Sequence, residues 1–481
     1  MAQAADDIRR IVAEVLGNAE IAALLGSADA GLKSAHATAE GSGVFSDVDG
    51  AVKAAAAAQR ELVALPLETR SRVIDAMRRA VISNNESLSR DAVAETGLGN
   101  LRDKQVKNTL AAEKTPGVED VRPCAFSDEH GLTLTEHAPY GVIGAITPVT
   151  NPIATITSNS IGMIAAGNSV VFNVHPGAKG ISNRLVAILN RAVSSVGGPR
   201  NLLCAVADPT IESAGALMKH PGVSILVVTG GPGVVKAAMG SGKKAICAGP
   251  GNPPCVVDQT ADIAKAGRDI VAGAGFDNNV VCICEKEVLA VEGIADRLKQ
   301  EMRAQGAFEL TGQQIEAVTR LAVPAFRGPR IESAPSKDLV GRDASYIARA
   351  AGIQVPEGTR LLLMDVGRDH PLVWTEQLMP VLPLVRMRSV DEAIDFAVEV
   401  EHGFRHTAMI HSHDIEKLSR MAKVMNCSLF VKNGPCYAGL GQGGAGYTSF
   451  TIASPTGEGI TRARTYTRER RCTLVDSFRI I

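Results

Sequence analysis

Short apolar runs alternate with amphipathic segments between residues 141 and 239, and this alternation restricts the possible folds more than any other feature. Strand-sized apolar runs cover residues 141–146, 169–172, 202–205 and 223–228. Segments with helical spacing cover residues 153–166, 180–193, 211–219 and 234–239. Apolar strands that alternate with helices are typical of a parallel sheet covered on both faces. The sequence therefore predicts an α/β protein with a Rossmann-like domain.

The remainder of the chain indicates further structure of the same kind. Two long helices are predicted ahead of the alternating region, at residues 49–65 and 84–96. A second block of strands and helices runs from about residue 261 to residue 431. The length of 481 residues allows two large domains or about three of ordinary size.

Composition excludes several classes of partner. Hydrophobic residues make up 45% of the chain and charged residues 21%, as in ordinary globular proteins. A net charge of -1 gives no overall field that would attract nucleic acid or an anionic membrane. The long uncharged stretch 138–174 is broken by prolines and glycines, so we expect no membrane-spanning helix. The 9 cysteines lack metal-ligand spacing, so we expect no metal site. Their number is odd and the chain is long, so we expect no disulfide framework, which favours a reducing compartment.

The N-terminal segment has a pattern of its own. Apolar residues recur at helical spacing within residues 1–18, which predicts a short amphipathic helix, and its acidic start differs from a secretory leader. Residues 19–44 are rich in Ala, Gly and Ser without a period, which predicts a flexible linker. A helix on a tether buries its apolar stripe by docking on a partner or on its own domain, and both possibilities stay open.

A cysteine stands in a polar turn within residues 275–287. Cys282 follows a Gly-Phe-Asp-Asn-Asn stretch, and Cys284 lies two positions further on. A thiol in such a turn can attack a carbonyl if its pKa is lowered or its proton is withdrawn. A free cysteine can equally be a small buried hydrophobic residue.

A glycine-rich turn lies between a predicted strand and a predicted helix. Gly230, Gly231 and Gly233 surround Pro232 there. Glycines at such a turn let the backbone approach a phosphate at the helix N-terminus. The spacing does not fit the G-x-G-x-x-G fingerprint, so a plain strand-to-helix turn is the alternative.

Four segments together resemble the aldehyde dehydrogenase superfamily. They occur in the order of that family and at about its spacing, at residues 146–152, 167–178, 275–287 and 376–381. The resemblance extends from about residue 45 to the C-terminus, and the cysteine segment is similar to that of the branch that forms acyl-coenzyme A (acyl-CoA).

The resemblance implies a domain organisation. We expect two Rossmann-like parallel-sheet domains and a β-arm for oligomerisation, so that the protein forms a dimer or tetramer. Residues 45–122 and 141–255 would form the NAD-binding domain and residues 256–449 the catalytic domain. Residues 123–140 and 450–481 would form the oligomerisation arm and the tail.

The resemblance also implies roles for particular residues. Cys282 would be the nucleophile, and Asn151 or its rival Thr150 would donate to the oxyanion together with the cysteine N–H. Thr229, Gly230 and Gly231 would lie over the cofactor pyrophosphate. The remaining cofactor positions are Glu376 at the nicotinamide ribose and, elsewhere along the nucleotide, Asn173, His175, Pro176, Gly177, Ala178 and Gly249.

Departures from the family pattern indicate the chemistry. Hydrolytic members use a glutamate to activate water, and Ala248 stands at that position here. Without a general base for water, a Cys282 thioester would pass its acyl group to coenzyme A (CoA). Asn173 and Pro176 replace the residues that usually hold and select the ribose, so NAD is expected but a 2′-phosphate is not strongly excluded.

The aldehyde itself is less constrained. The N-terminal helix and residues 453–459 are most similar to the propionaldehyde dehydrogenases of bacterial microcompartments, which implies cytoplasmic location inside such a shell. Propanal is favoured over acetaldehyde, although one methylene is worth only about 1–3 kcal/mol in a pocket. A non-catalytic shell-associated protein and an acyl-phosphate reductase are further alternatives.

Other polar residues near these motifs are expected to be structural. Four histidines gather in the sequence at positions 402, 406, 411 and 413, and structural roles are commoner for such residues than a proton shuttle. Lys286 and Glu287 are expected to be charges at a strand edge.

Overall fold

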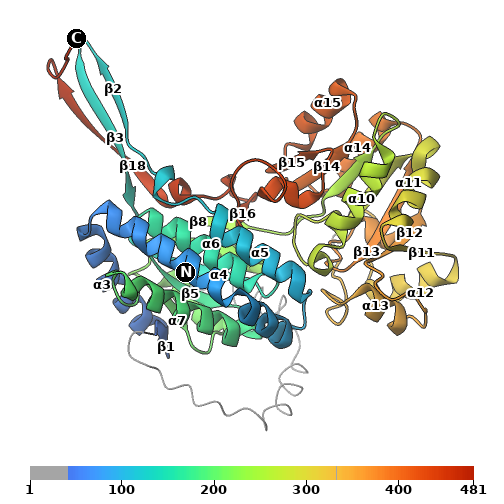
Figure 1. Cartoon of the computed structure of the whole chain (residues 1–481), viewed down its shortest axis with the longest axis horizontal. Helices are drawn as coiled ribbons and strands as arrows, with labels where there is room; N and C mark the ends of the chain where they lie inside the picture. The colour runs from blue at the N-terminus through green and yellow to red at the C-terminus, as the bar shows by residue number, and fades with distance from the viewer. Residues whose placement is uncertain (1–41, 332) are drawn as a thin grey trace, which may run out of the picture.

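Two parallel β-sheets lie side by side in the body of the molecule, and a narrow β-arm projects from it (Figure 1). The computed structural model describes residues 42–331 and 333–481. The predicted helix of residues 1–18 and nearly all of the predicted linker lie outside the described residues.

The first sheet has the Rossmann strand order. Its strands, from edge to edge, are β1 (Val44–Phe45), β6 (Leu203–Val206), β5 (Ser169–Val174), β4 (Val142–Thr147), β7 (Ile225–Thr229) and β8 (Lys244–Ala248). All of the pairings are parallel. The chain moves outward from β4 to β6 and then returns to the other side of β4 as β7. The order in which the chain adds strands therefore changes sense between β4 and β7. Parallel sheets of this kind bind ligands at that switch point.

Helices cover both faces of this sheet, as the apolar strands predicted. One face packs against α4 (Leu67–Thr96), α6 (Pro152–Ala165) and α7 (Lys179–Ser195). The other packs against α3 (Val48–Ala64), α8 (Ile211–Lys219) and α9 (Pro232–Met239). Along β4, Ile143 and Ala145 join the first cluster, whereas Val142 and Ile146 join the second. Period-two alternation of buried side chains is what a doubly covered strand requires.

The second sheet is also wholly parallel. Its strands, in order, are β11 (Ala307–Leu310), β12 (Leu361–Val366), β13 (Val381–Met387), β10 (Glu287–Val291), β9 (Pro254–Val257), β14 (Thr407–His411) and β15 (Leu429–Lys432). One face packs against α10 (Ile263–Ala274) and α11 (Glu292–Ala304). The other packs against α12 (Gln313–Ala322), α13 (Ala344–Ala350), α14 (Val390–Val400) and α15 (Ile415–Met425).

The α/β fold class with two Rossmann-like domains is therefore confirmed, with small shifts at its borders. Strand β9 begins at Pro254 and pairs with β10 and β14, so the last two residues of the predicted segment 141–255 lie in the second sheet. Val44 pairs with Ala205, so the sheet starts inside the predicted linker. The predicted helix 84–96 is the second half of α4, which begins at Leu67. Very short strands and long polar helices give weak periodic signals.

The arm is a three-stranded antiparallel sheet separate from the body. Strand β3 (Gly131–Pro139) pairs with β2 (Cys124–Asp128) on one side and β18 (Thr467–Val475) on the other. Figure 1 shows these strands extending away from the first domain. The predicted tail 450–481 is divided, because residues before β18 pack on the body. They include β16 (Ile452–Ala453), β17 (Gly459–Ile460) and Tyr466, which is buried.

Among the described residues, no helix combines the length and the apolar character needed to cross a membrane.

Asn168 connects the arm, the first sheet and α6. Its Oδ1 accepts hydrogen bonds from the backbone N–H groups of Tyr140 and Gly141, at 2.7 and 3.0 Å. Its Nδ2 donates to the carbonyls of Met163 and Tyr466, at 3.2 and 2.9 Å. The side chain is fully buried, and it satisfies backbone groups from three parts of the chain.

Replacing Asn168 by Ala should lower the free energy of unfolding by about 3 kcal/mol, because buried backbone groups lose their partner. Urea titration at equal protein concentration measures this change. Asn84→Ala is the control, since Asn84 bonds only within its own helix, to the Ala80 carbonyl, and should change stability by less than about 1 kcal/mol. Equal losses in the two variants would contradict the connecting role of Asn168.

Candidate active site

Cys282 lies in a turn between a short 3-10 helix, η3 (Phe276–Asn279), and strand β10. The preceding residues Asp277, Asn278 and Asn279 have φ values of 46°, 55° and 64°, in the left-handed region. Asp and Asn tolerate that region better than other residues with side chains. The Asp-Asn-Asn sequence is therefore what lets the chain coil tightly ahead of the cysteine. The Cys282 side chain is half-buried, whereas Cys284 is fully buried in the core.

Buried hydrogen bonds hold this turn rigid. Asn279 Nδ2 donates to the carbonyls of Ala274 and Glu285, at 2.8 and 3.1 Å. The Lys286 Nζ donates to the Asn279 carbonyl at 3.1 Å and also to its side-chain oxygen. The ends of the cysteine turn are thereby tied to each other.

The expectation that Lys286 and Glu287 are strand-edge charges is wrong. Both residues are fully buried, and β10 lies between β9 and β13 in the middle of the second sheet. Sequence alone could not show this, because charged residues are rarely buried without partners that only the fold supplies.

The thiol of Cys282 is held in its neutral form. Burial raises its pKa to about 12, and the negative charge of Glu376 adds to the increase, while Lys286 opposes it. Burial disfavours the charged form of any acid, and a nearby anion does the same for a thiolate. At neutral pH the protein without ligands therefore carries a protonated sulfur at this position.

Three ionisable groups next to the turn are also shifted toward their neutral forms. Burial raises the pKa of Glu285 to about 7, and raises that of Glu287 well above its usual range. Burial, together with the Lys286 charge, lowers the pKa of His406 to about 4. Glu285 accepts a hydrogen bond from the Cys436 N–H at 2.9 Å, whereas neither Glu287 oxygen has a hydrogen-bond partner.

The four histidines do not form one cluster. His411 is buried at the end of β14 and His413 is exposed beyond it. His402 shares a hydrogen bond with the Trp374 carbonyl at 2.9 Å. His406 lies close to the cysteine backbone, since a Cβ on Gly251 would lie 2.9 Å from the His406 Cγ and 3.0 Å from the Cys282 carbonyl. In residues 42–331 and 333–481, no three His, Cys, Asp or Glu residues are grouped to hold a metal ion.

Glu376 faces the segment that connects the two sheets. Its Oε1 accepts a hydrogen bond from the Gly251 N–H at 3.2 Å. Gly251 lies between β8 and β9, and Ala248, at the end of β8, is 3% exposed. A buried methyl group therefore stands at position 248, the position that the resemblance predicts for the water-activating residue.

The two oxyanion candidates follow the carboxyl end of β4. Asn151 is largely buried, and its Nδ2 donates to the Thr150 hydroxyl at 3.1 Å. The Asn151 Oδ1 accepts a hydrogen bond from Lys107 Nζ. Lys107 also contacts the Asp277 carboxylate, which belongs to the cysteine turn. This lysine therefore connects the first domain to the cysteine turn of the second.

Sequence reasoning missed Lys107 and its neighbour Lys104. Both lie on α5 (Leu101–Lys114), and both reach the same Asp277 oxygen. Burial and the adjacent Lys107 charge lower the pKa of Lys104 to about 8. Two lysines three residues apart on a polar helix give no signal in the sequence that separates them from a solvated face.

The glycine turn lies where predicted, next to β4. Thr229 ends β7, and α9 begins at Pro232, with Gly231 as its N-cap. A Cβ on Gly231 would meet no atom within 4 Å, so there is open space beside its backbone. Thr229 shares a hydrogen bond with Thr451 at 3.0 Å. The carboxyl ends of β4 and β7 thus place the oxyanion candidates and the glycine turn at one edge of the sheet.

The other predicted cofactor positions differ in accessibility. His175, Pro176 and Gly177 are exposed after β5. Ala178 is buried, and so is Asn173, whose Oδ1 accepts a hydrogen bond from the Ser213 hydroxyl at 2.5 Å. The Asn173 side chain therefore points into the protein and bonds to α8, which leaves the three exposed residues as the accessible part of this group.

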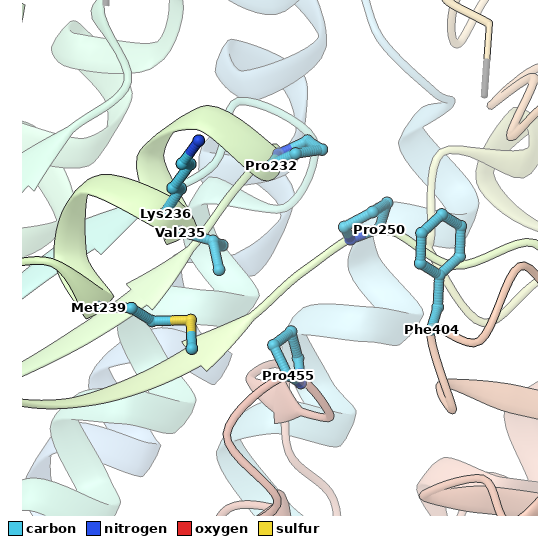
Figure 2. A pocket seen from close by; sticks show the side chains of 7 residues that line it. All are labelled: Pro232, Val235, Lys236, Met239, Pro250, Phe404 and Pro455. Carbon is cyan, nitrogen blue, oxygen red and sulfur yellow. The ribbon is translucent and has the colours of Figure 1, made fainter. Parts of the chain in front are cut away.

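An apolar cavity of about 340 Å³ adjoins the glycine turn. Figure 2 shows α9 on one side and segments of the second domain and tail on the other. The cavity is lined by Pro232, Val235, Lys236, Met239, Pro250, Phe404 and Pro455. Gly249 packs against this wall, because a Cβ there would lie 3.0 Å from the Pro455 Cγ. Apart from Lys236, the residues that line the cavity are apolar.

Two Rossmann-like domains, a glycine turn at the switch point of the first and a half-buried cysteine in a rigid turn of the second define a class. They are the parts of a nucleotide-dependent dehydrogenase that works through a covalent cysteine intermediate. The model of the aldehyde dehydrogenase family matches residues 35–451. The chain belongs to the aldehyde dehydrogenase family.

Curated relatives match nearly the whole chain. An acetaldehyde dehydrogenase (acetylating) of Bilophila wadsworthia is 47% identical over 482 residues, covering 99% of each chain. A propanal dehydrogenase (CoA-propanoylating) of Citrobacter freundii is 45% identical over 450 residues, covering 93% of this chain and 96% of the relative.

Solved structures match equally well. Propionaldehyde dehydrogenase of Rhodopseudomonas palustris, with bound CoA and an acylated cysteine, is 49% identical with a TM-score of 0.88, covering 90% of this chain and 98% of that one. An engineered glycolyl-CoA reductase with bound NADP+ is 48% identical with a TM-score of 0.89, covering 92% and 99%. A propionaldehyde dehydrogenase from the fucose utilisation microcompartment of Clostridium phytofermentans is 46% identical with a TM-score of 0.89, covering 91% and 100%.

The raised pKa of Cys282 predicts its reactivity in the protein without ligands. Alkylation by iodoacetamide, followed by mass spectrometry of the Cys282 peptide, should accelerate about tenfold per pH unit from pH 7 to pH 10, because the thiolate fraction rises that steeply below the pKa. A rate that levels off near neutral pH would contradict the buried neutral thiol.

Removing the Glu376 charge should speed the same reaction. Glu376→Gln keeps an acceptor for the Gly251 N–H but removes the anion that adds to the effect of burial on the Cys282 pKa. We expect about three- to tenfold faster alkylation of Cys282 at pH 8. Glu316→Gln, at an exposed site on α12, is the matched control and should leave the rate unchanged.

Proposed function

We propose that the chain oxidises a short-chain aldehyde to an acyl-CoA, with NAD as hydride acceptor and Cys282 as nucleophile. The observation that carries this proposal is the pairing of a half-buried cysteine in a rigid turn with a buried methyl group at Ala248. A thioester formed on Cys282 has no carboxylate at position 248 to activate water against it. A second thiol is then the better acyl acceptor.

The chemistry on Cys282 proceeds in two halves. The thiol releases its proton to solvent and the sulfur attacks the aldehyde carbonyl, which gives a thiohemiacetal whose oxyanion the Asn151 amide or the Thr150 hydroxyl stabilises. A nicotinamide bound beside Cys282 would accept the hydride that the aldehyde carbon has to lose to become the thioester carbon. The CoA thiol attacks this thioester, releases acyl-CoA and returns Cys282 to its starting form.

The described residues fit a dinucleotide. Thr229, Gly230 and Gly231 lead into the N-terminus of α9, and the open space beside Gly231 admits a pyrophosphate at that helix end. Glu376, beside Cys282, would hold the nicotinamide ribose. His175, Pro176, Gly177 and Gly249 would contact the adenosine part or CoA.

The family resemblance implies NAD as the physiological cofactor, but we expect only weak discrimination against NADP. No carboxylate stands at Asn173 or Pro176 to repel a 2′-phosphate. A relative of 48% identity has been solved with NADP+, which fits a site of weak discrimination.

Propanal is the aldehyde that we favour, with acetaldehyde as the alternative. Relatives named for each are 45–49% identical to this chain, so overall similarity does not separate them. The relative solved with CoA and an acylated cysteine is a propionaldehyde dehydrogenase, and so is the relative from a microcompartment. These two structures support the choice of propanal and a place inside a bacterial microcompartment in the cytoplasm.

The same proposal includes two kinds of protein partner. Residues 1–18 would bind the shell or other cargo of the microcompartment through their apolar stripe. The arm would bind a second copy in a dimer or tetramer, because Phe126 and Val475 are exposed on its outer strands and its edges are unpaired.

The acyl-enzyme provides the decisive test. Mixing the protein with propanal and NAD should add a propanoyl group to the Cys282 peptide by mass spectrometry, and CoA should then remove it as propanoyl-CoA. Cys282→Ala should abolish NADH formation, whereas Cys284→Ala should keep at least about a third of kcat, because Cys284 is buried in the core.

Other outcomes would select the alternatives. Free propanoate at an undiminished rate without CoA would refute thiolysis, and an acyl phosphate formed with inorganic phosphate would indicate a phosphate-dependent enzyme. No modification of any cysteine would favour a non-catalytic shell-associated protein. A faster kcat/KM with acetaldehyde than with propanal would reverse the choice of substrate.

Deleting residues 1–18 tests the packaging proposal separately. The truncated protein should keep the kcat of the full chain in solution but fail to co-purify with microcompartment shells. Loss of kcat on deletion would mean that this segment is part of the folded enzyme.

A further inference from the structure

A buried lysine on α5 joins the oxyanion candidate to the cysteine turn. Lys107 Nζ donates both to Asn151 Oδ1, in the first domain, and to Asp277 Oδ2, in the second. The side chains of Lys107 and Asp277 are 2% and 0% exposed. In the described structure, Lys107 thus links Asn151 to the turn that carries Cys282.

The contact fixes which way the Asn151 amide faces. A lysine ammonium can only donate, so the amide oxygen must point toward Lys107 and the amide nitrogen away from it. The nitrogen donates one hydrogen to the Thr150 hydroxyl at 3.1 Å, and an amide nitrogen carries two. The second N–H therefore remains on the side of the amide opposite Lys107.

Asn151 also departs from the usual role of its position. It is the N-cap of α6, where an asparagine side chain normally accepts a hydrogen bond from the helix backbone. Here the side chain makes no such bond, and Pro152 follows it at the first helical position. The amide has thus been drawn away from helix capping to the lysine.

The other end of the contact is equally fixed. Asp277 Oδ1 accepts a hydrogen bond from the Asn100 N–H at 2.9 Å, and the Asp277 N–H donates to Asp103 at 2.8 Å. Glycine at position 99 lets the Asp277 carboxylate approach the backbone, because a Cβ there would lie 2.0 Å from this carboxylate. The start of α5 therefore holds both the backbone and the side chain of the turn.

We propose that Lys107 is a positioning residue for acyl transfer, which orients the Asn151 amide toward the oxyanion and sets its place relative to Cys282. This inference rests on the proposed role of Asn151 as oxyanion donor. A purely structural role would make Lys107 equivalent to Lys104, which reaches the same Asp277 oxygen at 3.2 Å from one turn away and, among the described residues, donates no hydrogen bond to Asn151.

Lys104 therefore provides a matched control. Lys107→Met and Lys104→Met each leave Asp277 with one lysine partner. With propanal, NAD and CoA, Lys107→Met should lower kcat about 100-fold, as for loss of one oxyanion donor, with KM for propanal changed less than about threefold. Lys104→Met should keep kcat within about threefold of the parent, at a similar loss of stability in urea. Equal losses of kcat in the two variants would overturn the proposal.

A double-variant cycle separates this inference from the role on which it rests. If Lys107 acts through Asn151, Lys107→Met should lower kcat less than about threefold further in an Asn151→Ala background. Losses that multiply would overturn the coupling. Normal kcat in Asn151→Ala would refute the oxyanion role itself, whereas a low kcat there with a normal kcat in Lys107→Met would refute only the positioning role.

Two conservative variants keep the test decisive if Lys107→Met fails to fold. Lys107→Arg retains donors for both partners and should recover at least about a tenth of the parent kcat. Asn151→Asp keeps an acceptor for Lys107 but has no N–H, so it should stay folded and lose kcat as Asn151→Ala does. Parent-like kcat in Asn151→Asp would contradict the orientation of the amide.

Discussion

The buried carboxylate of Asp277 and its two lysines hold the two domains together at the candidate site. Lys104 and Lys107 extend from α5 of the first domain, and Asp277 belongs to the cysteine turn of the second. Burying such charges costs several kcal/mol per ion, and removing one partner typically destabilises a protein by about 3–5 kcal/mol. The cost is offset only by close geometry, so the turn cannot shift far from α5 or from the end of β4. Within this cluster, Lys107 is the residue that links the oxyanion candidate Asn151 to the cysteine turn.

The second constraint is electrostatic. The Cys282 turn sits on buried groups that favour their neutral forms, and the thiol itself has a pKa raised to about 12. A neutral sulfur is a poor nucleophile and also a poor target for oxidation. A cation bound beside it would stabilise the thiolate. Reactivity is thus tied to ligand binding, and Glu376 contributes because its charge acts on the sulfur while its carboxylate holds Gly251.

Local signals in the sequence were reliable wherever one helix or strand was decided by its own residues. Helix α8 was predicted to the residue at 211–219, and the structure shows that Thr210 starts it with a capping box to Ser213. The four motifs predicted the family, and the structure lays Thr150, Asn151 and the glycine turn at one edge of the first sheet. The first half of α4 was missed because its polar residues dilute the helical pattern. Lys286 and Glu287 were expected at a strand edge, since no rule based on neighbouring residues reports that β10 lies inside a sheet.

The sequence by itself determined the fold class, the cysteine in its Asp-Asn-Asn turn, and the absence of a carboxylate at Ala248. Each of these depends on residue type and local spacing, which act over a few residues along the chain. Only the tertiary structure decided that Lys107 bridges Asn151 and Asp277, that Asn173 turns inward to α8, and that the Cys282 thiol is neutral. Those properties depend on burial and on partners that are distant in the sequence. Lys107 and Asp277, for example, are 170 positions apart. Such contacts form only when both domains have folded, so residue type and local spacing do not predict them.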